Sequence, residues 1–142
     1  MSRANTKSRA ALASIGRMSE RTGVHIETIR YYERIGLLPK PLRSQGRHRL
    51  YDETHNRRLV FVRRSRALGF SLDQIRELLG LSRATELTCD EVKALTEQHI
   101  AGIRHKIRDL RRLDRVLNAL SARCRGGKIA TCPILETLGS AP

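Results

Sequence analysis

The fold is decided by residues 14–39, which read SIGRMSERTGVHIETIRYYERIGLLP. Apolar side chains recur at helical spacing in the first part of this stretch, and Gly23 ends that helix. A second helix is predicted over residues 25–34, and Gly36 and Pro39 close it. Two short helices joined by a tight, glycine-containing turn form the helix-turn-helix pattern.

The next segment, PKPLRSQGRHRLYDE at residues 39–53, predicts a short β-hairpin. Its two prolines exclude a helix at its start, and Gly46 supplies a turn. Residues 47–51 alternate as a strand does. Because the hairpin carries several basic side chains, we interpret it as a basic wing beside the two helices.

Two more helices are expected after the hairpin. Asp52 is positioned to cap the first, and Ser71 to cap the second over residues 71–81. Four residues of the first are expected to point into the core: Leu59, Val62, Ala67 and Leu68.

The last third of the chain predicts one long helix, because residues 89–123 contain no proline and a single glycine, Gly102. A narrow seam recurs along it in steps of three and four: Val92, Leu95, His99, Ile103, Ile107, Leu110, Leu113, Leu117 and Leu120. Packing on its own domain is the simpler interpretation. The seam is too long for that, so we favour a coiled coil between two protomers.

Charge points to a polyanionic partner. The chain has 28 Lys and Arg against 14 Asp and Glu, a net charge of +14. Residues 1–80 carry a net +10 and residues 81–142 a net +4, so the binding surface is expected in the first half. A merely soluble basic protein is the alternative.

No stretch is long and apolar enough for a membrane span, so we expect no membrane partner and a cytoplasmic location.

Nucleic-acid contacts are expected from the second helix and the wing. The outward face of residues 25–34 could reach base edges, and basic wing residues could neutralise phosphates. The predicted DNA-binding residues are Arg17, Thr28, Arg30, Tyr31, Arg43, Arg47, His48, Arg49 and Tyr51. A solvated surface charge is the alternative for any single arginine.

The three cysteines predict a metal site, with Cys124 and Cys132 at the ends of the loop CRGGKIATC. Cys89 precedes Cys124 by 35 residues, on the order of 50 Å of helix, so one chain cannot bring all three together. An antiparallel pair of helices would place Cys89 of one protomer beside the loop of its partner. Thiolates select Zn, Cu(I) and heavier ions. Inert buried cysteines or a structural zinc site are the alternatives.

The remaining residues do not predict catalysis. No Ser/His/Asp arrangement, phosphate-binding glycine loop or paired carboxylates stand out, so we expect no enzyme. His99 falls on the apolar seam and is expected at an interface. His55 and His105 are expected on the surface.

Taken together, IETIRYYERIGLLP, RLYDE, RALGFSLDQIRELLGL, TCDEV and C-x7-CPIL resemble the MerR family of metal-responsive transcription regulators over residues 14–138. The resemblance implies a mostly α fold, with a winged helix-turn-helix domain, an antiparallel coiled-coil homodimer and a C-terminal metal-binding loop. His48 stands where an aromatic residue is common in the family. The expected organisation is a flexible tail at 1–13, the DNA-binding domain at 14–84, the dimerisation helix at 88–123, the loop at 124–135 and a tail at 136–142.

The resemblance also implies a mechanism. Such dimers bind a palindrome inside an over-long promoter spacer, with or without metal. Metal binding then shifts the two DNA-binding domains. The promoter DNA is bent and untwisted, so RNA polymerase can engage both promoter elements.

For the metal, the resemblance favours a thiophilic divalent ion, because a cysteine at the position of Cys89 is typical of divalent-ion sensors. Three thiolates fit Hg(II) best, with Cd(II), Pb(II) or Zn(II) possible. The loop between Cys124 and Cys132 is as long as in copper sensors, so a Cu(I) or Ag(I) sensor using the loop alone is an alternative. Two further alternative functions are a thiol redox sensor of the same fold and a metal-buffering protein.

Overall fold

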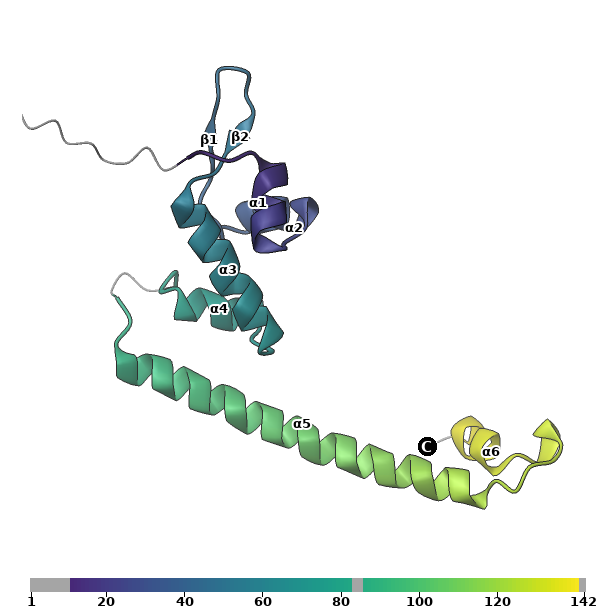
Figure 1. Ribbon diagram of the computed structural model, residues 1–142. Helices are drawn as coiled ribbons and strands as arrows, with labels where there is room; N and C mark the ends of the chain where they lie inside the picture. Colours follow the sequence, from purple (N-terminus) through teal and green to yellow (C-terminus); the bar gives the residue numbers. More distant parts are fainter. Residues whose placement is uncertain (1–10, 83–85, 141–142) are drawn as a thin grey trace, which may run out of the picture. The chain divides into compact units, whose positions relative to one another are not determined.

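The computed structural model describes residues 11–82 and 86–140 (Figure 1). The chain divides into two compact units, the first ending at Val92 and the second beginning at Lys93. The described residues are mostly helical, with a helix-turn-helix, a small hairpin and one long C-terminal helix. The predicted fold class is confirmed in these elements.

The first two helices meet in a tight turn. Helix α1 (Ile15–Thr22) ends at Gly23, whose φ of 70° is left-handed and therefore suits glycine. The Thr22 hydroxyl donates to the Met18 carbonyl at 2.8 Å and accepts from the Val24 N–H at 3.3 Å. This side chain fixes the turn from which α2 (Ile26–Arg34) starts.

The wing is an antiparallel hairpin of β1 (Leu42–Arg43) and β2 (Arg49–Leu50), and it projects from the helices in Figure 1. Arg43 pairs with Arg49 across it. Beyond β2, the backbone of Tyr51 exchanges hydrogen bonds of 2.8 and 2.9 Å with Ala13. Ala13 is buried, so ordered structure begins before Ser14, inside the predicted N-terminal tail. Residues 1–10 of that tail lie outside the described residues.

Helix α3 (Glu53–Ala67) and helix α4 (Leu72–Leu78) both begin with a capping box. Asp52 and His55 form the first box, and Ser71 and Gln74 form the second, as local sequence predicts for the caps. Helix α3 packs on α1 and α4.

The core of this unit includes Met18, Ile29, Leu37, Leu59 and Ile75, none of which is exposed. Val62 is also buried, as predicted. Two inward predictions were wrong. Ala67 is exposed, and Leu68, at the C-terminal cap of α3, is 67% exposed, whereas the next core residue is Phe70.

The surface prediction for His55 was also wrong. The residue is 6% exposed. Its Nδ1 lies 2.7 Å from Asp52 Oδ1 and its Nε2 lies 3.2 Å from the Pro39 carbonyl. Because both ring nitrogens have partners, the imidazole can be buried. His105 is exposed, as predicted.

Helix α5 (Cys89–Arg123) has the predicted bounds. Thr88 and Glu91 cap it reciprocally, with the Thr88 N–H donating to the Glu91 carboxylate at 2.8 Å. Much of the predicted seam is exposed in this single chain: Val92, Ile103, Ile107, Leu110, Leu113 and Leu117. Leu120 is the seam residue that is buried among those described.

After α5 the chain passes through the 3-10 turn η1 (Ile129–Thr131) into α6 (Pro133–Gly139). Figure 1 shows α6 beside the C-terminal end of α5. Helix α6 therefore covers most of the segment that we had expected to be a C-terminal tail. None of the described helices is both long and apolar enough to span a membrane.

Candidate nucleic-acid interface and cysteine site

Helix α2, the second helix of the helix-turn-helix and the predicted recognition helix, has a buried and an outward face. Ile29 and Tyr32 are buried against the core, which leaves the predicted contact residues on the other side. Tyr31 is 41% exposed, and Thr28 and Arg30 are partly exposed. An aromatic hydroxyl, a small hydroxyl and a guanidinium are thus at least partly accessible on this helix, and such groups can contact base edges and phosphates.

Arg30 is held by an acidic neighbour on the same helix. Its Nη1 donates to Glu27 Oε1 at 2.7 Å, and the Glu27 side chain is 78% exposed. The carboxylate partly neutralises the guanidinium on the surface that would meet DNA. Arg17 lies on α1 and is exposed.

The tip of the wing is basic and exposed. Arg43, Arg47 and His48 are all exposed, and Arg43 donates to the Arg47 carbonyl at 3.1 Å. Arg47 has a left-handed φ of 61°, which the tight turn requires. The Arg47 N–H donates to the Ser44 carbonyl at 2.9 Å and the Ser44 N–H to the His48 carbonyl at 2.9 Å. These bonds hold the basic side chains on a defined loop.

Arg49 and Tyr51 differ from the tip. Arg49 Nε donates to Glu33 Oε2 at 3.2 Å, and its side chain is 31% exposed. Tyr51 has no exposed surface, and its hydroxyl donates to the other Glu33 oxygen. Burial and the Glu33 carboxylate raise the pKa of Tyr51 far above its ordinary value. Because its side chain is covered, Tyr51 supports the wing instead of offering a surface to DNA.

A cleft of about 400 Å³ lies between the end of α2 and the wing. Four cationic side chains line it, together with Glu33 and Pro41: Arg34, Lys40, Arg43 and Arg49. Glu33, Arg34 and Lys40 are not among the contact residues predicted from the sequence. The signal available for the two cations was their position on either side of the helix-to-wing connection. No sequence pattern around Glu33 predicts its contacts with Arg49 and Tyr51.

The loop cysteines lie together. The chain places Cys124 directly after α5 and Cys132 directly before α6, and both are free thiols. The two side chains lie near enough for the Cys124 thiol to influence the pKa of Cys132. The backbone N–H groups of Leu135 and Ile134, at the start of α6, lower the pKa of Cys132, and the Cys124 thiol adds to this effect.

Cys89 is exposed at the first residue of α5. Within residues 11–82 and 86–140, no three His, Cys, Asp or Glu side chains gather closely enough to hold a metal ion. A single chain therefore brings Cys124 and Cys132 together without a third ligand.

Two family models match the chain. The one described as MerR HTH family regulatory protein matches residues 13–81, and the one described as MerR, DNA binding matches residues 56–120. A mercuric resistance operon regulatory protein of Bacillus cereus is 43% identical over 125 residues, covering 87% of this chain and 95% of that protein.

Two solved structures are similar over most of the chain. The transcription regulator PbrR691 from Ralstonia metallidurans CH34, crystallised with lead(II), has a TM-score of 0.77 at 45% identity, covering 89% of this chain and 99% of that one. MerR of Bacillus megaterium MB1, crystallised with mercury(II), has a TM-score of 0.69 at 37% identity, covering 90% of this chain and all (100%) of that one. The chain thus belongs to the MerR family, whose members are DNA-binding regulators of transcription and not enzymes.

Proposed function

We propose that this protein is a homodimeric, metal-sensing transcriptional regulator whose inducer is a thiophilic divalent ion, with Hg(II) favoured and Cd(II), Pb(II) or Zn(II) as alternatives. The proposed ligands are Cys124 and Cys132 of one protomer and Cys89 of the other. The observation that carries the proposal is the pair of free thiols at the two ends of one short loop, near enough to influence each other's titration, in a chain that has only three cysteines.

The donor set fits such an ion. Both loop ligands are soft sulfurs, and the lowered pKa of Cys132 favours the thiolate form that binds metal. The two similar structures were crystallised with lead(II) and mercury(II), ions of this class. When bound, the ion would supply a link between the loop of one protomer and the first turn of α5 in the other.

The apolar seam supports a second protomer as the source of Cys89. Cys89 and Cys124 both continue the seam, since they stand three residues before Val92 and four after Leu120. Ten steps cover the 35 residues between the two cysteines, an average of about 3.5 residues, which is the coiled-coil repeat. In an antiparallel pair, the start of one seam lies beside the end of the other.

On the DNA side, we propose that Arg17, Thr28, Arg30 and Tyr31 meet the operator from the two helices. Arg43, Arg47 and His48 would contact its backbone from the wing. Arg49 and Tyr51, which bond to Glu33, would support the wing. We further propose that binding of the ion shifts the two DNA-binding domains, which distorts a promoter spacer so that RNA polymerase engages both promoter elements.

A second candidate is a Cu(I) or Ag(I) sensor that uses the loop alone. One observation favours it: Cys124 and Cys132 lie near each other within one chain, and a soft monovalent ion prefers thiolate ligands such as these two. In this case Cys89 would not be a ligand.

A titration separates the two candidates. The reduced dimer is titrated with Hg(II), Cd(II), Pb(II), Zn(II) and Cu(I), each in competition with a chelator, while thiolate-to-metal absorption is followed. Cys89→Ser and Cys132→Ser are titrated beside it. Divalent binding that collapses in both variants supports the three-thiolate site. Cu(I) preference that survives Cys89→Ser and is lost in Cys132→Ser supports the loop alone.

A promoter reporter then tests the response. Serine at Cys89, Cys124 or Cys132 should abolish metal-induced transcription and leave operator binding intact. Variants that still respond to metal would show that the ligand assignment is wrong. A response to peroxide that chelators do not affect would replace metal sensing with thiol oxidation.

A further inference from the structure

We propose that Glu33 is a positioning residue that sets the wing against the recognition helix, and that Arg49 is its partner in this role. Neither part of the proposal gives Glu33 a contact with DNA. The inference rests on DNA recognition by this domain and does not depend on the proposed metal response.

One carboxylate joins the two DNA-facing elements at two points. Glu33 lies near the end of α2, and its side chain is only 9% exposed. One oxygen accepts from Arg49 Nε at 3.2 Å and the other from the Tyr51 hydroxyl. Residues two apart on a strand point to the same side, so Arg49 and Tyr51 can both donate to the one carboxylate.

Tyr51 is itself fixed by other parts of the domain. Its backbone is paired with Ala13 in both directions. Its buried ring meets the ring of His55 edge-on, with centroids 5.4 Å apart. The hydroxyl that reaches Glu33 is therefore held by the core, and so the carboxylate links α2, the wing and the core.

The wing hairpin needs a contact that holds it to the rest of the domain. Its two strands have two residues each, and a short isolated hairpin is at best marginally stable in water. The exposed side chains at its tip could hold a fixed position on the phosphate backbone only if the base of the hairpin is held. Glu33 and Arg49 supply that fixed base.

The charges in the cleft point the same way. Glu33 is the carboxylate among four cations at a surface that faces a polyanion, where an unpaired carboxylate would repel phosphate. Its burial and its two donors remove that repulsion. Arg49 directs its Nε inward to Glu33, whereas Arg43, directly opposite on the hairpin, is exposed. Arg49 and Arg43 are thus paired in register but differ in role.

The test compares these two arginines. An operator is first selected from a random-sequence DNA pool with the full-length protein. Affinity for that operator and for a random duplex of equal length is then measured over a salt series for wild type, Glu33→Gln, Arg49→Gln and the double variant. Arg43→Gln is the matched control, because it removes the same charge from the facing strand position.

The expected result separates positioning from phosphate contact. Glu33→Gln and Arg49→Gln should each lower the ratio of operator to random-duplex affinity by about tenfold or more, the effect of losing one charge-assisted hydrogen bond. The double variant should lose no more than Glu33→Gln alone, because Arg49 acts through Glu33. Arg43→Gln should instead lower both affinities alike and reduce the salt slope by about 0.9.

The opposite pattern would overturn the proposal: Arg49→Gln behaving like Arg43→Gln, with single-variant effects that add. Hydroxyl-radical footprints give a second measurement. Loss of protection at the wing, with protection by α2 retained, is expected for Glu33→Gln, and uniform weakening would contradict it. If Glu33→Gln does not fold, Arg49→Gln decides alone, because it leaves the Glu33–Tyr51 bond in place. A wild type that selects no operator would refute DNA recognition itself.

Discussion

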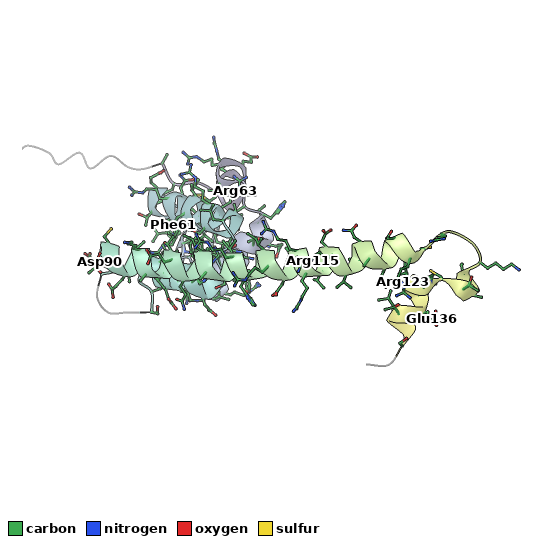
Figure 2. All side chains as sticks on the ribbon, turned by 90° about the horizontal axis from the view of Figure 1, so that it is seen from below. Phe61, Arg63, Asp90, Arg115, Arg123 and Glu136 are labelled. Carbon is green, nitrogen blue, oxygen red and sulfur yellow. The ribbon has the colours of Figure 1, made fainter. Side chains whose placement is uncertain are left out.

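Arg63 on α3 donates from Nη1 to the carbonyl oxygen of Thr22 at 3.1 Å, and this bond joins α3 to the end of α1. The same guanidinium lies against the glycine that begins the turn of the helix-turn-helix. A Cβ added at Gly23 would stand 2.7 Å from Arg63 Nη1. Figure 2 labels Arg63 within the DNA-binding unit. The end of α1 is thus bonded to a side chain 41 residues further along the chain.

This relationship predicts that Gly23→Ala destabilises more than backbone strain alone explains. Gly23 and Gly36 have left-handed φ values of 70° and 71°, but nothing lies within 4 Å of a Cβ at Gly36. Gly36→Ala should cost ~1–2 kcal/mol, the strain of a left-handed alanine. Gly23→Ala should cost ~2–4 kcal/mol, because Arg63 must also move. Urea unfolding measures the free energy of unfolding of both variants. Equal destabilisation would show that the Arg63 side chain moves aside at no cost.

Asp52 predicts a pH dependence of stability. The N–H and side chain of His55 lower the pKa of this carboxyl, with the backbone bond the larger cause. A carboxyl with a depressed folded pKa stabilises the fold above its unfolded pKa of about 3.9 and loses that contribution as pH falls through the folded pKa. Asp52→Asn keeps a capping oxygen. Wild type should therefore be the more stable protein at pH 7, and the difference should vanish in acid.

Urea unfolding from pH 7 to pH 2 checks this expectation. Glu53→Gln, one residue along, controls for loss of a carboxylate from the first turn of α3. A difference between wild type and Asp52→Asn that stays constant down to pH 2 would show that the cap does not depend on the charge.

Glu27 predicts a gain of DNA affinity on mutation. Glu27→Gln releases Arg30 and removes a carboxylate from the recognition helix. Exposed pairs of this kind are worth at most ~1 kcal/mol, so affinity should rise by up to about fivefold on operator and random DNA alike. Glu97→Gln is the control, since Glu97 forms a similar exposed pair with Lys93 on α5, 3.7 Å apart. Fluorescence anisotropy measures both, and a loss of operator affinity in Glu27→Gln would show that Glu27 contacts a base.

A substitution at Leu117 tests the predicted dimer interface along α5. Leu117 is 58% exposed in the single chain and lies on the seam. Leu117→Glu should remove ~1.5–3 kcal/mol of apolar burial per copy, so the dimer constant should weaken by at least about a hundredfold. Sedimentation equilibrium measures this. Arg115, labelled in Figure 2, lies off the seam, and Arg115→Glu should stay dimeric. Equal behaviour of the two variants would place the interface elsewhere.

The elements with local signals could be predicted from the sequence. Gly23, Asp52 and Ser71 end or begin helices through bonds that span four residues or fewer. The bounds of α5 followed from a long stretch without proline. These predictions held because the interacting groups are neighbours along the chain, and so their geometry needs nothing from the rest of the fold.

Which side chains are covered depends on the folded structure. Tyr51 and His55 are polar residues that local pattern placed on the surface, yet both are buried because partners 16 or 18 residues earlier satisfy them. Leu68 is apolar but exposed at the end of α3. The approach of Cys124 to Cys132 depends likewise on how the loop folds. Burial depends on what the folded chain brings opposite a residue, which hydrophobic period and charge along the sequence do not specify.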